Sequence, residues 1–138
     1  IKKSLNADVT EELTHATQLA NRIKTINGII PGSMKFEPLQ QTLQPPRDTT
    51  DVVAVIKGVI DAEDAAIAQY EKIIRLCDGF DFVTQDMCIT LLADEQQHRR
   101  EFVGFLKEYE KAWVGRGKFG TQKVLVNNDL GVQTVGWA

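Results

Sequence analysis

Apolar residues recur at intervals of three and four along three long stretches of the chain, the spacing that places side chains on one face of an α-helix. The first stretch covers about residues 4–26 and ends at Asn27-Gly28, a pair typical of a helix C-terminus. The second covers about 51–76, after a capping signal at Thr50-Asp51, and the third about 82–113. The apolar stripes contain Leu5, Val9, Ala16, Leu19, Ile23 and Ile26 in the first stretch, Val52, Ile56, Val59, Ile60, Ala66, Ile67, Tyr70 and Ile74 in the second, and Met87, Leu91, Phe102 and Phe105 in the third. At about 1.5 Å per residue these helices would reach roughly 35 to 45 Å, a length typical of helical bundles.

The connection between the first two predicted helices, residues 28–50, has no sustained period and holds all four prolines of the chain. A connection that long is uncommon in a small domain unless it must cover a long distance between the two elements that it joins. After about residue 115 the helical period is lost again. We therefore predict two parts, a helical bundle over 1–114 and an irregular tail over 115–138, for which a hairpin or an extended arm is the alternative.

Five ionisable side chains stand where these helices should be apolar. Glu12 and His15 continue the stripe of the first helix, Glu63 lies between two isoleucines of the second, and Glu95 and His98 continue the stripe of the third. Both histidines of the chain therefore follow a glutamate by three residues. Buried, unpaired carboxylates cost on the order of several kcal/mol each, so they must be protonated, paired or bound to cations.

The pattern favours cations, because the nearby lysines and arginines fall on other helix faces. These residues are Lys57, Lys72, Arg99 and Arg100. The sequence therefore predicts a metal site made of carboxylates and imidazoles, without thiolates. That ligand set suits iron or manganese better than structural zinc.

Composition narrows the range of partners. A net charge of −3 gives no electrostatic reason to expect nucleic acid or an anionic membrane surface. Cys77 and Cys88 are too few for a disulfide framework, and we expect reduced thiols in or near the core, which favours a cytoplasmic location. No run approaches the roughly 18 apolar residues that cross a bilayer. Small molecules, ions or proteins are the expected partners.

Two of the predicted helices resemble helices of bacterioferritins. The first, over EELTHATQLANRIKTINGIIP, is similar to their second helix, and the third, over DFVTQDMCITLLADEQQHRREFVGFL, is similar to their last long helix. The resemblance covers about residues 4–111 and implies an all-α, ferritin-like four-helix bundle. In that fold the connection 28–50 is the crossover that lets the second and third helices run parallel. The family's first helix, which carries a further terminal glutamate, has no counterpart here and is expected to precede Ile1 or to come from another chain.

The resemblance also implies a di-iron site. Carried over residue by residue, Glu12 and Glu95 would bridge two metal ions, His15 and His98 would each bind one, and Glu63 would be a terminal carboxylate. The three glutamates are therefore the expected catalytic residues. Iron is the expected metal, with manganese as the alternative.

Three further positions bear on this site. Tyr70, seven residues after Glu63, is a candidate hydrogen-bonding neighbour, with simple core packing as the alternative. Glu11 is a candidate for relaying iron, with a solvated surface residue as the alternative. Bacterioferritins hold haem with a methionine directly after the glutamate of their second helix; Leu13 stands there, and Met34 lies in the crossover, so we expect no haem.

The leading hypothesis is a ferroxidase, which would oxidise Fe(II) with O2 or H2O2 and, as a homo-oligomeric shell, store the ferric product. Other ferritin-like di-metal bundles are peroxidases, manganese catalases or oxygenases, and the fold does not choose among them. A third hypothesis is an assembly module whose tail docks to a partner and whose metal site is vestigial.

Overall fold

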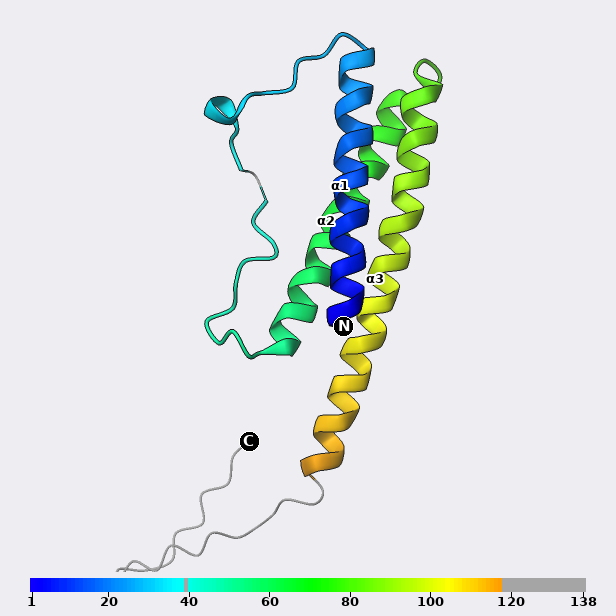
Figure 1. Ribbon diagram of the computed structural model, residues 1–138. Helices are drawn as coiled ribbons and strands as arrows, with labels where there is room; N and C mark the ends of the chain where they lie inside the picture. The colour runs from blue at the N-terminus through cyan, green and yellow to red at the C-terminus, as the bar shows by residue number, and fades with distance from the viewer. Residues whose placement is uncertain (39, 118–138) are drawn as a thin grey trace, which may run out of the picture.

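A computed structural model of the chain describes residues 1–38 and 40–117, with side chains as far as Ala112 (Figure 1). In this part of the chain the regular elements are all helical, as predicted. They are α1 (Lys2–Thr25), the short 3-10 turn η1 (Ser33–Lys35), α2 (Val52–Cys77) and α3 (Phe82–Gly117). The predicted and observed ends differ most at α3, which continues into the segment expected to be irregular. The remainder of the predicted tail, 118–138, lies outside the described residues.

α2 and α3 form an antiparallel hairpin whose helix starts are both capped by aspartates. The Asp51 carboxylate accepts a hydrogen bond from the Ala54 N–H at 2.9 Å, which confirms the predicted start of α2. The Asp81 carboxylate accepts one from the Thr84 N–H at 3.0 Å at the start of α3. Between the two helices, Gly79 has a φ of +81°, a left-handed conformation that glycine adopts most easily.

The core of the hairpin consists of two apolar clusters with a polar layer between them. One cluster contains Ile56, Val59 and Phe102, and the other contains Tyr70, Cys88 and Leu91. The buried polar residues Glu63, Glu95 and His98 come between these clusters along α2 and α3. Cys77 and Cys88 are buried free thiols, as expected. The apolar clusters therefore fix the two helices on both sides of the polar layer.

α1 runs antiparallel to α3, and the long connection returns the chain so that α1 and α2 run parallel (Figure 1). Near one end of α1, the Ser4 hydroxyl donates a hydrogen bond to the Glu101 carboxylate. Near the other end, Arg22 donates to Asp81 at 2.6 Å and to the Thr84 hydroxyl at 2.7 Å. The directions of the three helices confirm the crossover that the resemblance to bacterioferritins implied.

The predicted apolar stripe of α1 is only partly correct. Leu5 and Leu19 pack against the two clusters of the hairpin. The remaining stripe residues are exposed, namely Val9, Ala16, Ile23 and Ile26. Within the described residues α1 comes close to α3 but not to α2, so the face of α1 that carries the exposed stripe residues has no neighbouring helix.

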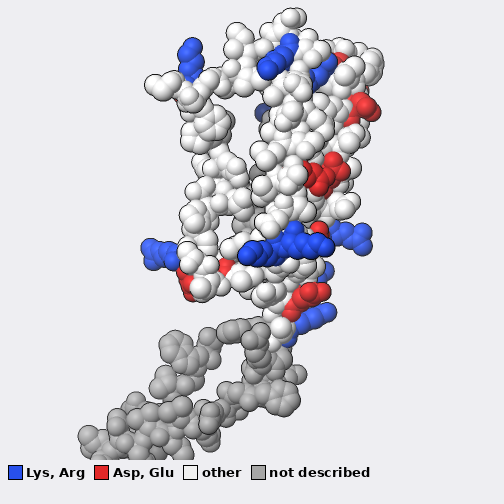
Figure 2. All heavy atoms as spheres, in the orientation of Figure 1, with Lys and Arg blue, Asp and Glu red and all other residues white. Residues whose placement is uncertain are grey.

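Figure 2 shows the molecule in the same orientation as Figure 1, with uncharged residues covering most of the visible surface and charged ones scattered among them.

No helix within the described residues combines the length and the apolar character that a membrane span needs.

Candidate metal centre

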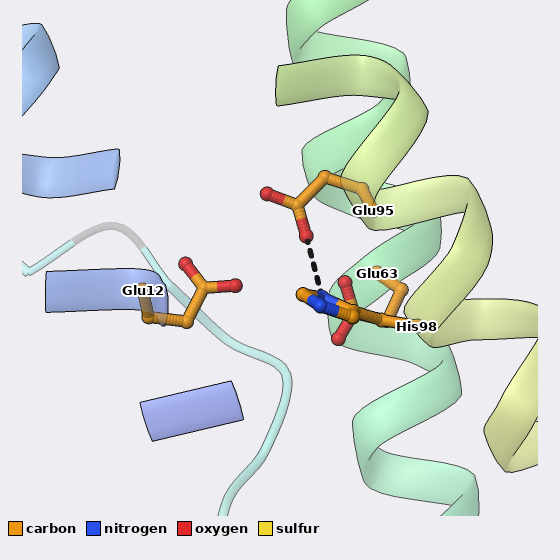
Figure 3. A group of neighbouring side chains, drawn as sticks. All are labelled: Glu12, Glu63, Glu95 and His98. Atoms are coloured by element: carbon orange, nitrogen blue, oxygen red, sulfur yellow. Dashed lines mark ion pairs between the residues drawn. The ribbon is translucent and has the colours of Figure 1, made fainter. Parts of the chain in front are cut away.

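Four of the five predicted ligands converge at the centre of the bundle (Figure 3). Glu12 comes from α1, Glu63 from α2, and Glu95 and His98 from α3. One ligand atom of each lies within 4.8 Å of those of the other three. Glu63, Glu95 and His98 are buried, as predicted. The Glu12 side chain was also expected in the core, but it is 51% exposed. The polar layer of the α2–α3 hairpin is therefore completed by one carboxylate from α1.

His15, the fifth predicted ligand, lies against the same carboxylate as His98. Its side chain is 4% exposed, and its Nδ1 is 3.3 Å from Oε1 of Glu95 and 3.9 Å from Oε2 of Glu12. The Nδ1 of His98 is 3.5 Å from the other Glu95 oxygen, Oε2. The Glu95 carboxylate is thus placed between the inner nitrogens of two histidines on two helices.

These inner atoms are buried but unsatisfied. Nδ1 of His15, Nδ1 of His98 and Oε2 of Glu95 have no hydrogen-bond partner. Buried polar atoms in proteins are nearly always paired, so three such atoms facing one another form a donor group that a bound cation would satisfy. Imidazole nitrogen and carboxylate oxygen are both ligands of divalent iron and manganese, and the donor set therefore fits such ions.

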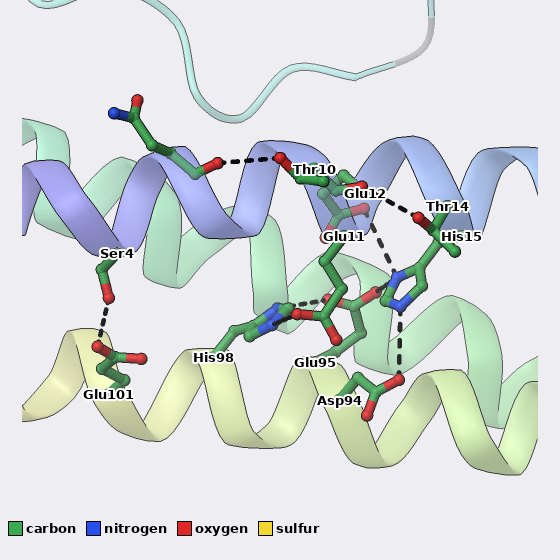
Figure 4. A network of polar contacts seen from close by, with 11 residues as sticks. Ser4, Thr10, Glu11, Glu12, Thr14, His15, Asp94, Glu95, His98 and Glu101 are labelled. Atoms are coloured by element: carbon green, nitrogen blue, oxygen red, sulfur yellow. Dashed lines mark hydrogen bonds and ion pairs between the residues drawn. The ribbon is translucent and has the colours of Figure 1, made fainter.

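The outer nitrogens of the two histidines face other carboxylates (Figure 4). Nε2 of His98 is 3.2 Å from Oε2 of Glu11, and Nε2 of His15 is 3.4 Å from Oδ2 of Asp94. Glu11 was a candidate neighbour of the site, and the structure places it beside His98. Asp94 was missed by the sequence reasoning. The signal that could have found it is that an acidic residue directly precedes the glutamate in both Glu-x-x-His motifs.

Crowding in the buried layer changes how the carboxylates hold protons. Burial raises the pKa of Glu63 to about 9, and the hydrogen bond with Glu95 and the negative charges of Glu95 and Glu12 act in the same direction. Burial, with the charge of Glu95, also raises the pKa of Glu12. Without a cation, the layer therefore holds protons that ordinary glutamates would release. A bound divalent ion would displace them, because metal ligands must be deprotonated.

Opposing effects act on His98. Burial lowers its pKa, but the hydrogen bond with Glu11 and the negative charges of Asp8, Glu11 and Glu95 outweigh burial, and the pKa of His98 lies above its ordinary value. The site is therefore strongly negative in character. Such a field favours cations of any kind over neutral ligands.

The cationic side chains that the sequence placed on other faces do not neutralise this charge. Arg99 pairs with Asp64 at 2.5 Å on the surface, and Lys57, Lys72 and Arg100 are exposed. Among the described residues, the basic groups within ion-pair distance of Glu12 and Glu95 are the two histidine rings only, which carry a charge only when protonated.

Tyr70 is buried in the apolar cluster with Cys88 and Leu91, which corresponds to the packing alternative. Burial, followed by the charges of Glu95 and Glu12, raises the pKa of Tyr70. Leu13, at the position of the haem methionine in the resembling family, is 66% exposed, and Met34 in η1 is 96% exposed. The expected absence of haem remains a prediction from the missing sulfur at position 13.

An open pocket of about 870 Å³ reaches the carboxylates of Glu12, Glu63 and Glu95 from the side of the crossover. Its other lining residues are uncharged: Gln40, Gln41, Thr42, Leu43, Ala62, Ala65, Ala66 and Gln69. Small ions and molecules can therefore reach the buried layer without crossing the apolar clusters.

A comparison with models of protein families found a match that covers the helical bundle and the candidate site. The family model described as the ferritin-like domain matches residues 1–112, a range that includes α1, α2 and all five candidate ligands. Comparisons with curated proteins and with solved structures gave no significant match.

Proposed function

The chain belongs to the ferritin-like family, and on that premise we propose that it is a ferroxidase that binds two Fe(II) ions as substrate. The observation that carries the proposal is the Glu95 carboxylate, which is 1% exposed and lies between the unpaired Nδ1 atoms of His15 and His98. A carboxylate with a histidine at each oxygen can bridge two ions, each held by one imidazole. Manganese is the alternative metal.

The other carboxylates have complementary roles in this proposal. Glu12 comes from the opposite side and would form the second bridge, while Glu63 would bind one ion as a terminal ligand. Glu12 is half-exposed at the pocket, so its side chain can move to admit substrate. Glu63 is buried and holds a proton when no cation is present, which it releases when an ion binds.

The reaction balances with either oxidant. Each Fe(II) loses one electron, and the two electrons with two protons reduce O2 to H2O2, or reduce H2O2 to two molecules of water. The open pocket, which is uncharged apart from the site's own carboxylates, gives both oxidants a path to the site. If the chains assemble into a closed shell, the Fe(III) product can be retained inside as mineral.

Oxidation of added Fe(II) tests the proposal. The metal-free full chain is mixed with two equivalents of Fe(II) under anaerobic conditions, then exposed to O2 or H2O2, and the formation of Fe(III) is followed by absorbance together with oxygen uptake. We expect oxidation well above the rate of free Fe(II), and a loss of at least about tenfold in Glu95→Ala and in His98→Ala. Glu108→Ala, which removes an exposed carboxylate from α3, is the matched control.

Unchanged oxidation in both Glu95→Ala and His98→Ala would contradict the proposal. Disproportionation of H2O2 by the manganese-loaded chain, without oxidation of Fe(II), would instead favour a manganese catalase. Mass in solution, measured by size exclusion with light scattering, separates a shell from a dimer or a monomer.

A further inference from the structure

The two histidines of the site are held by a reciprocal pair of contacts across the α1–α3 interface (Figure 4). Glu11 on α1 contacts Nε2 of His98 on α3 at 3.2 Å. Asp94 on α3 contacts Nε2 of His15 on α1 at 3.4 Å. Each helix therefore supplies one histidine and the carboxylate that faces the outer nitrogen of the other helix's histidine.

Helix geometry explains why neighbouring acidic residues contact different partners. Successive residues of an α-helix point about 100° apart. Glu12 and Glu95 turn toward the ligand group, and the residues that directly precede them, Glu11 and Asp94, turn toward the opposite helix. The same two-residue unit, acid followed by glutamate, is thus used once on each helix.

We propose that Glu11 and Asp94 are positioning residues that hold the His98 and His15 imidazoles with Nδ1 toward the metal ions. The inference rests on the proposed function, because it assigns roles around the same site. A neutral imidazole has one N–H donor and one acceptor nitrogen. When Nε2–H donates to an outer carboxylate, the lone pair is left on Nδ1, which in both histidines is the buried, unpaired atom beside Glu95.

The contacts also restrict where each ring can point. Both histidines are almost fully buried, and their outer nitrogens face carboxylates of the opposite helix. Carboxylates that accept the second N–H of a metal-binding histidine fix the ring and make it a stronger ligand. Glu11 and Asp94 are partly exposed and keep part of their hydration, so each stays ionised at lower cost than a buried acid would.

Glu11, His15 and Asp94 could alternatively bind a third ion, since one ligand atom of each lies within 4.8 Å of the others. In that case Nε2 of His15 would be a ligand and could not carry a proton. The two arrangements are distinguished by the number of ions bound and by the nitrogen that carries the proton.

The test uses Zn(II) as a diamagnetic probe and the full chain labelled with 15N at histidine. Zinc affinity is measured by calorimetry, and nitrogen shifts of both rings are recorded with and without zinc at about pH 8, well above the ordinary pKa of histidine because the pKa of His98 is raised. We expect Zn(II) on Nδ1 and a proton on Nε2 in both rings. Glu11→Ala should change the Nε2 signal of His98, and Asp94→Ala that of His15, each with a loss of affinity of about 10- to 100-fold.

The crossed pattern is the decisive readout. A general loss of negative charge, or a partial loss of folding, would affect both histidines in either variant. Glu11→Gln and Asp94→Asn keep an acceptor oxygen, so they should recover the proton position and part of the affinity. Asp86→Ala and Glu108→Ala, which remove exposed carboxylates from α3, should change neither ring.

Three results would overturn the inference: unchanged affinity and nitrogen shifts in both alanine variants, Zn(II) bound to Nε2, or a third ion that disappears in Asp94→Ala. If the unaltered chain still oxidises Fe(II) in those cases, the proposed function stands without the positioning role. Failure of the unaltered chain to bind zinc or to oxidise Fe(II) would contradict the proposed function itself.

Discussion

α3 packs against two helices in two different ways. Toward α2 it presents mainly apolar side chains, in the two clusters around Phe102 and Leu91 that lie on either side of the buried polar layer. Toward α1 it presents mainly polar side chains, from Glu101 near one end to Asp81 near the other, with the histidine network between them (Figure 4). The same helix is thus an apolar partner on one side and a polar partner on the other.

The difference shows which contacts carry stability and which carry chemistry. Apolar burial is non-directional and stabilises in proportion to the area removed from water. Hydrogen bonds and ion pairs contribute less net stability, but they require particular partners at particular distances. The α2–α3 hairpin is therefore expected to be the stable unit, and the position of α1 to depend on the state of the site.

Removing the centre of the apolar interface should have the largest effect. Phe102 is fully buried with Ile56 and Val59, and its ring meets Phe105 edge-to-face with 5.6 Å between centroids. Phe102→Ala should lower the free energy of unfolding by roughly 3–5 kcal/mol, measured by urea denaturation followed by circular dichroism. Phe82→Ala removes the same side chain from an exposed position of α3 and should cost far less. Equal losses in the two variants would contradict an apolar core at Phe102.

The polar layer should make the metal-free protein sensitive to pH. In the folded chain Glu63 keeps its proton up to about pH 9, whereas its ordinary pKa is 4.5. Between these values the folded state binds more protons than the unfolded state, so stability should fall as pH rises from about 4.5 to about 9. Glu63→Gln keeps the shape without the titration and should flatten this dependence.

Urea midpoints of the metal-free chain across that pH range measure the effect. Asp61→Asn, an exposed acid on the same helix, is the matched control and should retain the slope of the unaltered chain. A slope that survives in Glu63→Gln would show that the pH dependence comes from another group. Stability that rises with pH would contradict the protonation of Glu63.

Sequence periodicity predicted the apolar interface better than the polar one. The stripes of α2 and α3 identified Ile56, Val59, Leu91 and Phe102 correctly, because both helices bury the face that is richest in apolar residues. The length of the connection indicated only that it must cover a long distance, and the resemblance to bacterioferritins implied the crossover.

Periodicity could not determine which face of α1 turns inward. A stripe through Leu5, Val9 and Ile23 and a stripe through Asp8, Glu11 and His15 have the same helical spacing, and the choice between them depends on the neighbouring helix. α3 offers polar partners, so the second stripe faces it and Val9 remains exposed. Asp94 was missed for the same reason, because its partner is on another helix.

The smallest expected effect concerns the end of the polar interface. Arg22 joins α1 to the start of α3 through Asp81 and Thr84, at 2.6 and 2.7 Å, and these side chains are only partly buried. Arg22→Ala should therefore loosen the C-terminal turns of α1 and leave the apolar hairpin intact. Hydrogen exchange read by mass spectrometry should show severalfold faster exchange near residues 20–26, with unchanged protection around Phe102 and Leu91.

Arg75→Ala, which removes an exposed arginine paired with Glu71 at 3.4 Å, is the matched control and should change neither region. Equal acceleration in α1 and in the hairpin would mean that the two interfaces of α3 open together, and the contrast between them would then be one of chemistry but not of stability.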